Sequence, residues 1–374
     1  MTLLRKIALY ALPFALPFLL LTGALTYIGE SLPLSEVLRL QAGDTPVLYR
    51  VRYGNRDQRY KRMAVDYFQP DVMMIGSSRV LQFRSDFMNL NPDAFYNAAA
   101  PAWQLGEISR LLFTMNHRPD MIILGIDDAW FNADYGGDPI VQPPTSDFDR
   151  FFIVNRTVIQ EILDGETLDL RKLLSREEPG GSGGLALGSR AIIDGHGFRN
   201  DGSEQYGDFL VAQHLWQPNM RGLHIGWFEE GAEMYVRGDV VDDEAMQQLR
   251  AILDFAQEND ILVIGLYPPY MPSLWQRLEN SADHSYLRDA TIEVESLFAE
   301  YDFPYFDFHN GAAVGATDED FFDGWHSSER IAAQMFINIA REVPQLEQYS
   351  DLDALQEIVN TASDTFGVFP FTAQ

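Results

Sequence analysis

Short apolar runs alternate with amphipathic segments over much of this chain, and this alternation restricts the possible folds more than any other feature. Residues 72–75, 121–124 and 261–264 are apolar runs of strand length, each bounded by polar or turn residues. Continuous apolar strands that alternate with helices predict an α/β fold, with a mainly parallel sheet covered by helices on both faces. Helical periodicity is found over 105–115, 244–258, 286–301 and 329–341.

An uncharged segment, 7–28, precedes this alternating region. A helix over these residues is long enough to cross a bilayer, at about 1.5 Å of rise per residue. Arg5 and Lys6 precede the segment, and Glu30 and Glu36 follow it. The positive-inside rule therefore predicts a single-pass anchor in the lipid bilayer, with a cytoplasmic N-terminus and a periplasmic or extracellular remainder. A buried core helix and a cleaved signal peptide are the alternatives that we weighed.

The other segments are arranged around the alternating region. Residues 136–240 interrupt the alternation, are rich in glycine in places, and are too long for a plain loop. The predicted organisation is a cytoplasmic tip and transmembrane anchor over 1–30, a stem over 31–66, a core over 67–135 plus 241–345, an inserted subdomain or lid over 136–240, and a C-terminal tail over 346–374.

Composition excludes several classes of function. The net charge of −28, from 55 acidic and 27 basic side chains, repels phosphates, so nucleic acid is not expected as a partner. The chain has no cysteine, which excludes disulfides, thiolate nucleophiles and cysteine-bound metals. The acidic groups 318–320 and 127–128 lack a complete calcium-binding loop. We therefore predict no cofactor and no metal.

Ser78 is the candidate nucleophile. It follows the 72–75 run in the sequence Gly76-Ser77-Ser78-Arg79, where a strand-to-helix turn would present the hydroxyl at the edge of the sheet. A serine hydroxyl needs an imidazole to take its proton, and a carboxylate to orient that imidazole. Asp323 and His326 provide such a pair, and none of the other six histidines has an aspartate three positions before it.

These two motifs resemble the nucleophile block and the terminal D-x-x-H block of the SGNH/GDSL hydrolase superfamily. The resemblance covers 67–135 and 240–345. It implies a three-layer α/β/α sandwich of SGNH or flavodoxin-like type, in which Ser78 attacks an ester, His326 acts as general base and Asp323 orients it. The backbone N–H groups of Ser78 and Ala102 would hold the oxyanion, with Ala102 at the place of a family glycine.

The third family block departs from the pattern. Gly125-Ile126-Asp127-Asp128 places Asp127 where the family has an asparagine that donates to the oxyanion. An ionised carboxylate only accepts hydrogen bonds. Either Asp127 is protonated, or it orients another group, or the donor comes from elsewhere, with Arg79 and Asn132 as the nearest candidates.

The overall organisation is most similar to membrane-anchored SGNH proteins of alginate and other exopolysaccharide O-acetylation systems. This closer resemblance implies an acylated glycan or small acyl ester as substrate, and a multi-pass membrane acyltransferase as a possible partner. Esterase and O-acyltransferase activities stay open, because they differ in the acceptor rather than in the nucleophile. A non-catalytic protein that binds the acyltransferase or the glycan is the alternative from another class.

Other motifs compete for these roles. Residues 180–184 fit the G-x-S-x-G pattern but follow no strand. Asp307 and His309 form a second acid–imidazole pair after an apolar segment, although the spacing of Asp323 and His326 favours the latter. His196, His214 and His224, with Trp216 and Trp227, either line a sugar-binding cleft or pack in the interior, and packing is the favoured interpretation.

Overall fold

A five-stranded parallel sheet forms the centre of the protein. The computed structural model describes residues 3–53, 57–100, 104–136, 146–164, 170–179, 181–207 and 219–371. The sheet has the order β3-β2-β4-β8-β9, and every pairing in it is parallel. Its strands are β2 (Val72–Ile75), β3 (Phe95–Asn97), β4 (Met121–Gly125), β8 (Leu262–Tyr267) and β9 (Tyr305–Asp307). The chain therefore changes its direction of winding between β2 and β4, and in parallel α/β sheets such a switch point is where ligands usually bind.

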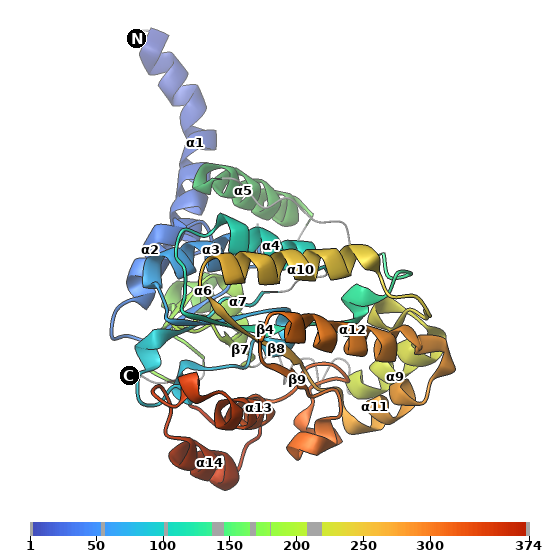
Figure 1. Ribbon diagram of the computed structural model, residues 1–374. Helices are drawn as coiled ribbons and strands as arrows, with labels where there is room; N and C mark the ends of the chain where they lie inside the picture. Colours follow the sequence, from blue (N-terminus) through green and yellow to red (C-terminus); the bar gives the residue numbers. More distant parts are fainter. Residues whose placement is uncertain are drawn as a thin grey trace.

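Helices cover both faces of this sheet. In Figure 1, α4 (Leu105–Thr114) and α10 (Asp243–Glu258) lie on one side, and α13 (Glu329–Glu342) and α14 (Leu352–Thr361) lie on the other. Every residue of β2 and β4 is buried, which explains why these strands are apolar without alternation. The predicted α/β class and the predicted parallel sheet are both confirmed.

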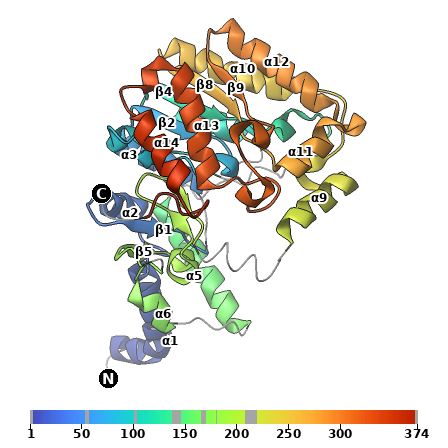
Figure 2. The same ribbon diagram turned by 90° about the horizontal axis from the view of Figure 1, so that it is seen from below.

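A second sheet joins two segments that are distant in sequence. It has four strands in the order β5-β1-β6-β7, in which β1 (Val47–Tyr49) pairs with β5 (Leu185–Leu187) and β6 (Gly197–Phe198). β7 (Glu204–Gln205) completes it. Residues of the predicted stem and of the predicted insertion therefore share one sheet. Figure 2 shows β1 and β5 grouped with α1, α5 and α6 at one end of the molecule, away from α10 and α12.

Among the described residues, nine further α-helices connect and flank the two sheets. They are α1 (Leu3–Tyr27), α2 (Leu34–Gln41), α3 (Asp57–Phe68), α5 (Asp147–Leu163), α6 (Leu170–Ser175), α7 (Ser189–Asp194), α9 (Met220–Glu230), α11 (Pro272–Glu279) and α12 (Tyr286–Glu300).

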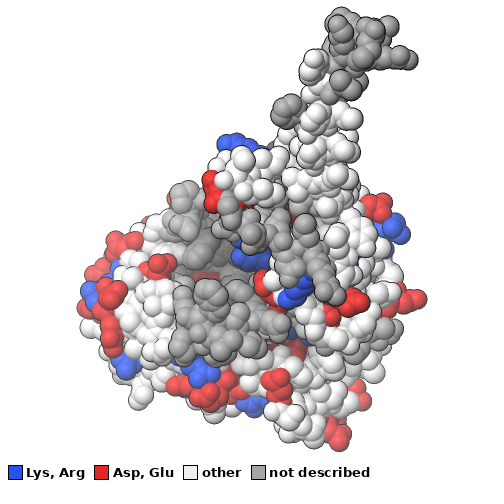
Figure 3. All heavy atoms as spheres, turned by 180° about the vertical axis from the view of Figure 1, so that it is seen from behind, with Lys and Arg blue, Asp and Glu red and all other residues white. Residues whose placement is uncertain are grey.

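The prediction of a membrane anchor is contradicted. Within the described residues, no helix has both the length and the apolar character needed to cross a bilayer. α1 projects from the body (Figures 1 and 3), and its residues 10–27 include no charged side chain, but its C-terminal end is packed on protein. Leu25 and Ile28 are buried in a cluster with Val154 of α5, and Thr22 Oγ1 donates a hydrogen bond to Asn155 Oδ1 at 2.8 Å. The predicted single-pass topology, and the location inferred from it, are therefore wrong.

Glu30, three residues after α1, binds the backbone of the segments that follow β1 and β5 in the second sheet. Its side chain is fully buried and accepts hydrogen bonds from the backbone N–H groups of Arg52, Tyr53 and Ser189, at 2.7 to 2.8 Å. Burial raises the pKa of Glu30, although these donors act in the opposite direction. One carboxylate thus links three segments. Removal of this carboxylate would take away the acceptor that these three N–H groups share.

We expect Glu30→Ala to lower the free energy of unfolding by about 3 kcal/mol or more, because a buried polar group left unsatisfied costs roughly 1–3 kcal/mol. Urea unfolding measures this loss. Glu36→Ala is the control, since Glu36 forms only an exposed pair with Arg39 and should change stability by less than about 1 kcal/mol. Equal stability losses in the two variants would contradict the role given to Glu30.

Candidate active site

Ser78 lies in a tight turn at the carboxyl end of β2. It is the first residue of a short 3-10 helix, Ser78–Val80, that begins after Gly76 and Ser77. Gly76 has a positive φ of 158°, and a Cβ atom there would lie 2.8 Å from the carbonyl oxygen of Gly125 at the end of β4. Glycine therefore allows the two strand ends to approach closely, which places Ser78 beside the loop that follows β4.

Asn97 holds this turn in place from the neighbouring strand. Its buried amide nitrogen donates to the carbonyl oxygens of Val80 at 2.9 Å and Phe83 at 3.0 Å, while its oxygen accepts from Ala99 N–H at 3.0 Å. Asn97 therefore fixes the backbone of the segment that carries the candidate nucleophile.

The candidate triad is assembled from the two ends of the core. Ser78 Oγ lies 2.8 Å from His326 Nε2, and His326 Nδ1 lies 2.8 Å from Asp323 Oδ2. Ser78 and His326 are both partly accessible, whereas Asp323 is buried. A nucleophile, a base and an orienting carboxylate are thus connected in the order that acyl transfer through a serine requires.

The loop that carries His326 is fixed by its own hydrogen bonds. Asp323 Oδ1 accepts from the backbone N–H groups of Trp325 and His326, both at 2.7 Å. Phe322 N–H donates to the carbonyl oxygen of His326 at 3.0 Å, and Ser328 caps α13 immediately afterwards. These contacts keep one oxygen of Asp323 on the backbone and leave Oδ2 for the imidazole.

The electrostatics of the pair agree with this geometry. Burial acts to lower the pKa of His326, but the Asp323 carboxylate outweighs it, so the pKa of His326 is raised above its ordinary value. Burial acts to raise the pKa of Asp323, but His326 outweighs it and the pKa of Asp323 is held well below its ordinary value. Asp323 is therefore ionised at neutral pH, and the imidazolium that forms when His326 takes a proton is stabilised.

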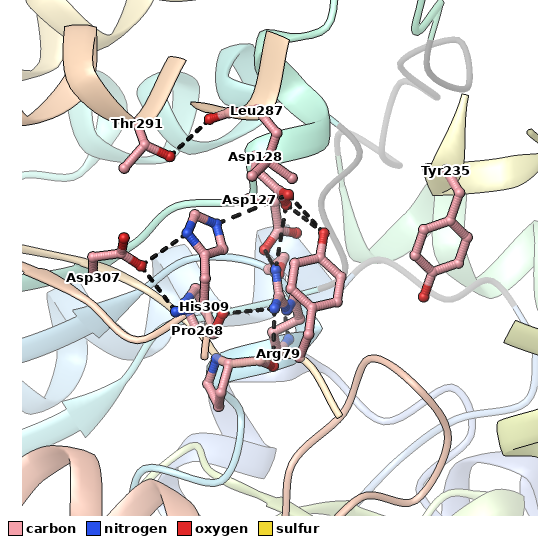
Figure 4. Close-up of polar contacts among 12 residues, drawn as sticks. Arg79, Asp127, Asp128, Tyr235, Pro268, Leu287, Thr291, Asp307 and His309 are labelled. Atoms are coloured by element: carbon pink, nitrogen blue, oxygen red, sulfur yellow. Dashed lines mark hydrogen bonds and ion pairs between the residues drawn. The ribbon is translucent and has the colours of Figure 1, made fainter. Parts of the chain in front are cut away.

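The side chain of Arg79 binds backbone carbonyls and buried carboxylates, although Arg79 directly follows Ser78 in the sequence. Its side chain is fully buried, and Nη2 donates to the carbonyl oxygens of Pro268 at 2.7 Å and Pro269 at 3.0 Å. Its Nη1 lies 3.5 Å from Asp127 Oδ1 and 3.6 Å from Asp128 Oδ1 (Figure 4). The guanidinium group thus compensates two buried carboxylates, and these contacts give no support to its predicted role as an oxyanion donor.

Asp127 is buried at the carboxyl end of β4, next to the serine turn. Burial raises its pKa to about 6, despite the opposing effects of Arg79, of a hydrogen bond with the Ser77 side chain, and of His326. Asp127 therefore changes its charge close to neutral pH. Below about pH 6 its carboxyl group can donate a hydrogen bond, and above that pH it can only accept.

The competing pair, Asp307 and His309, also forms, but it lies on a different network. His309 Nδ1 is 2.8 Å from Asp307 Oδ1, and Nε2 faces Asp128 Oδ2 at 3.9 Å (Figure 4). Asp128 in turn accepts from the hydroxyl of Tyr270, at 2.7 Å from each carboxylate oxygen. The structure therefore brings Ser78 to His326, whereas His309 belongs to a separate buried polar cluster with Asp128 and Arg79.

The other predicted residues take different positions. Ala102 and the neighbouring residues 101 and 103 lie outside the described residues, although Ala100 N–H reaches the carbonyl oxygen of Gly76 at 3.3 Å. Asn132 Nδ2 donates to the carbonyl oxygen of Val236 at 2.7 Å, and its Oδ1 accepts from Asp134 N–H. Asn132 thus secures a backbone turn, and its role at an oxyanion stays a prediction.

The two described histidines of the 136–240 segment, His196 and His224, have different partners. His196 Nε2 binds buried Glu204 at 2.8 Å, and His214 and Trp216 lie outside the described residues. His224 is buried next to Asp323, a contact that sequence analysis missed. In the 180–184 motif, Ser182 Oγ accepts from Gly184 N–H, which describes a local turn rather than a nucleophile paired with a base.

Comparison with models of known protein families, with characterised proteins and with solved structures found no match to this chain. The assignment of the site therefore depends on its own geometry.

We expect Asp323→Asn to lower the pKa of His326, because the carboxylate that raises it is lost. Titration of the imidazole by NMR measures this change, and Asp307→Asn is the control because Asp307 pairs with His309 instead.

The raised pKa of His326 stabilises the fold below about pH 6.5, and the lowered pKa of Asp323 stabilises it above about pH 4. The stability that Asp323→Asn removes should thus be greatest between these values. An unchanged pKa of His326 would show that the pair is not coupled.

Proposed function

We propose that this protein is a serine esterase or O-acyltransferase of the SGNH/GDSL type. The observation that carries the proposal is the hydrogen-bonded chain from Ser78 Oγ through His326 to Asp323 at the carboxyl edge of a parallel sheet. The strand order gives further support. Counted along the chain, the strands of this sheet follow the order 2-1-3-4-5, which is that of flavodoxin-like folds, and Ser78 and Asp127 both follow strands at the switch point.

The proposed reaction begins when Ser78 Oγ attacks the carbonyl carbon of an ester and His326 Nε2 takes the hydroxyl proton. The tetrahedral intermediate collapses, the C–O bond to the alcohol breaks, and His326 returns the proton to the departing alkoxide. This step leaves the acyl group on Ser78. Water or a sugar hydroxyl, deprotonated by His326, then attacks the acyl carbon, the C–O bond to Ser78 breaks, and Ser78 Oγ takes the proton back from His326. Asp323 holds the Nδ1–H tautomer of His326 throughout.

The oxyanion formed in this reaction needs hydrogen-bond donors. Ser78 is the first residue of a short helix, and the first N–H groups of a helix have no hydrogen-bond acceptor within that helix. Protonated Asp127 would add a donor at the place of the family asparagine, whereas ionised Asp127 would repel the developing negative charge. Activity should therefore require Asp127 to be neutral and His326 to be unprotonated at the same time.

The substrate class follows from the resemblance alone. An acetyl or other acyl ester of a glycan is the proposed substrate. A sugar hydroxyl as acceptor would make the protein a transferase, and water would make it an esterase. The predicted multi-pass membrane acyltransferase partner stays a prediction.

A non-catalytic binding protein is the second candidate, and the charge of Asp127 favours it. An ionised carboxylate beside the serine turn is unfavourable for an oxyanion, and a protein that only binds a ligand would not need to avoid it. Labelling with a serine-reactive fluorophosphonate separates the two candidates, because the probe reacts with an activated serine.

We expect the wild-type protein to hydrolyse a small acetyl ester and to be labelled by the fluorophosphonate at Ser78. Ser78→Ala should lose the labelling and at least about 10³-fold in kcat. Ser182→Ala is the matched control and should keep the labelling, because Ser182, the serine of the 180–184 motif, accepts a hydrogen bond from Gly184 N–H at 3.0 Å in a local turn. Ester hydrolysis that survives Ser78→Ala unchanged would remove this serine from the mechanism.

We expect Asp127→Asn to raise the rate of ester hydrolysis at pH 8 by up to about 10²-fold, since a neutral amide would replace a carboxylate that is ionised above about pH 6. The gain should shrink as the pH falls through 6, where the wild-type carboxyl becomes protonated. Asp127→Ala separates the two causes, because it removes the charge without adding a donor. A rate for Asp127→Asn that stays at or below that of the wild type at pH 8 would argue against a role at the oxyanion.

A further inference from the structure

A second imidazole contacts the carboxylate of the triad. His224 lies in α9, within the 136–240 segment, and is only 3% exposed. Its Nε2 is 3.5 Å from Asp323 Oδ2, the same oxygen that binds His326 Nδ1 at 2.8 Å. Asp323 thus lies between two histidines, one facing Ser78 and the other brought from a distant segment of the chain.

The hydrogen bonding of His224 determines which nitrogen carries its proton. Nδ1 lies 2.8 Å from the hydroxyl of Tyr235. A neutral imidazole has one donor and one acceptor, and ionised Asp323 can only accept. The Nε2–H tautomer therefore faces Asp323, and the phenol of Tyr235 donates to Nδ1. At 3.5 Å the contact with Asp323 is that of an N–H dipole directed at a charge rather than a short hydrogen bond.

The surroundings keep His224 in this position and keep it neutral. Its ring packs on Trp227, with centroids 4.7 Å apart, and edge-on against Tyr235 at 5.8 Å. Burial lowers the pKa of His224 to about 4, against the opposing effect of Asp323, while His326 lowers it further. His224 is thus uncharged at neutral pH. It does not form a second ion pair that would take the carboxylate from His326.

Gly324 makes this approach possible. A Cβ atom at position 324 would lie 2.7 Å from His224 Cβ and 2.8 Å from Leu274 Cδ2. The backbone next to Asp323 therefore passes against α9 at a distance that only glycine allows. The chain has a glycine between the carboxylate and the histidine of its D-x-x-H motif, and the structure gives that glycine a specific neighbour.

We propose that His224 is a positioning residue of the triad. Its Nε2–H, oriented by Tyr235, holds Oδ2 of Asp323 and shares the negative charge that Asp323 presents to His326. The inference rests on the proposed function for its catalytic meaning, but its physical content, the coupling of His224 to His326 through Asp323, is independent of turnover. It also gives the 136–240 segment a direct contact with the site.

The test compares two substitutions. His224→Phe removes the N–H and keeps an aromatic ring, so the full charge of Asp323 falls on His326 and the pKa of His326 should rise. The acid limb of the kcat profile should move to higher pH by the same amount. The kcat at pH 6, on the acid limb, should fall about tenfold for each pH unit by which the pKa of His326 rises, with KM unchanged. His224→Gln retains an N–H donor and should remain close to the wild type.

His284→Phe is the matched control. His284 is another buried histidine, and its Nε2 contacts the backbone carbonyl of Tyr235 at 3.0 Å rather than Asp323. The His284→Phe variant should leave the pKa of His326 unchanged. Gly324→Ala provides a second perturbation that displaces His224 without changing it, and it should raise the pKa of His326 as His224→Phe does.

The pKa of His326 is measured by NMR in full-length protein carrying Ser78→Ala, where no turnover is needed. A rise in His224→Phe or Gly324→Ala, absent in His284→Phe, supports the inference even if the wild type proves to be inactive, in which case only the proposed function fails. An unchanged pKa of His326 in both perturbing variants overturns the inference, whatever the activity of the wild type.

Discussion

The site depends on the parallel pairing of β2 with β4. In a parallel sheet the strands end at one edge, so the residues that follow Ile75 and Gly125 are brought together there. The close approach at Gly76 tightens this arrangement, and Asn97 fixes the turn from β3. The loop before α13 then closes on the same edge. Ser78 and His326 therefore lie side by side at this edge of the sheet, although they are far apart in the sequence.

Two carboxylates near this edge are in opposite electrostatic states. Asp323 is surrounded by two backbone N–H donors and two imidazoles, which lower its pKa and keep it ionised. Asp127 is buried with one guanidinium that it shares with Asp128, and its pKa is raised to about 6. Environments that move the pKa values of nearby groups apart are a feature of acid–base sites. In this arrangement Asp323 can serve as a permanent anion, while Asp127 is able to change its charge.

The core was predictable because its signals are local. The apolar runs at 72–75 and 121–124 are strands, and the helices near 244 and 329 begin at capping residues, Asp242 and Ser328. The second sheet was not foreseen, since its strands are two or three residues long and pair across distant segments. The apolar segment 7–28 gave a wrong prediction, because composition does not reveal that Leu25 and Ile28 pack on protein.

The site could be predicted only in part, for a similar reason. Spacing identified Asp323 with His326, since three residues on a turn place a carboxylate beside its own imidazole. Arg79 was considered for the oxyanion because it follows Ser78, but the direction of a side chain depends on tertiary packing, and this one points into the interior. His224 was interpreted as packing because its contact with Asp323 is made between α9 and a distant loop. Nothing in the sequence around His224 indicates that contact.

The central claim is that Ser78 becomes acylated, and mass spectrometry of the protein after brief exposure to an activated acetyl ester tests it most directly. The account predicts a gain of one acetyl group on the peptide that contains Ser78, much reduced when His326 is replaced by alanine and reversed on longer incubation in water. Acetylation confined to lysines, or equal in the His326→Ala protein, would contradict it.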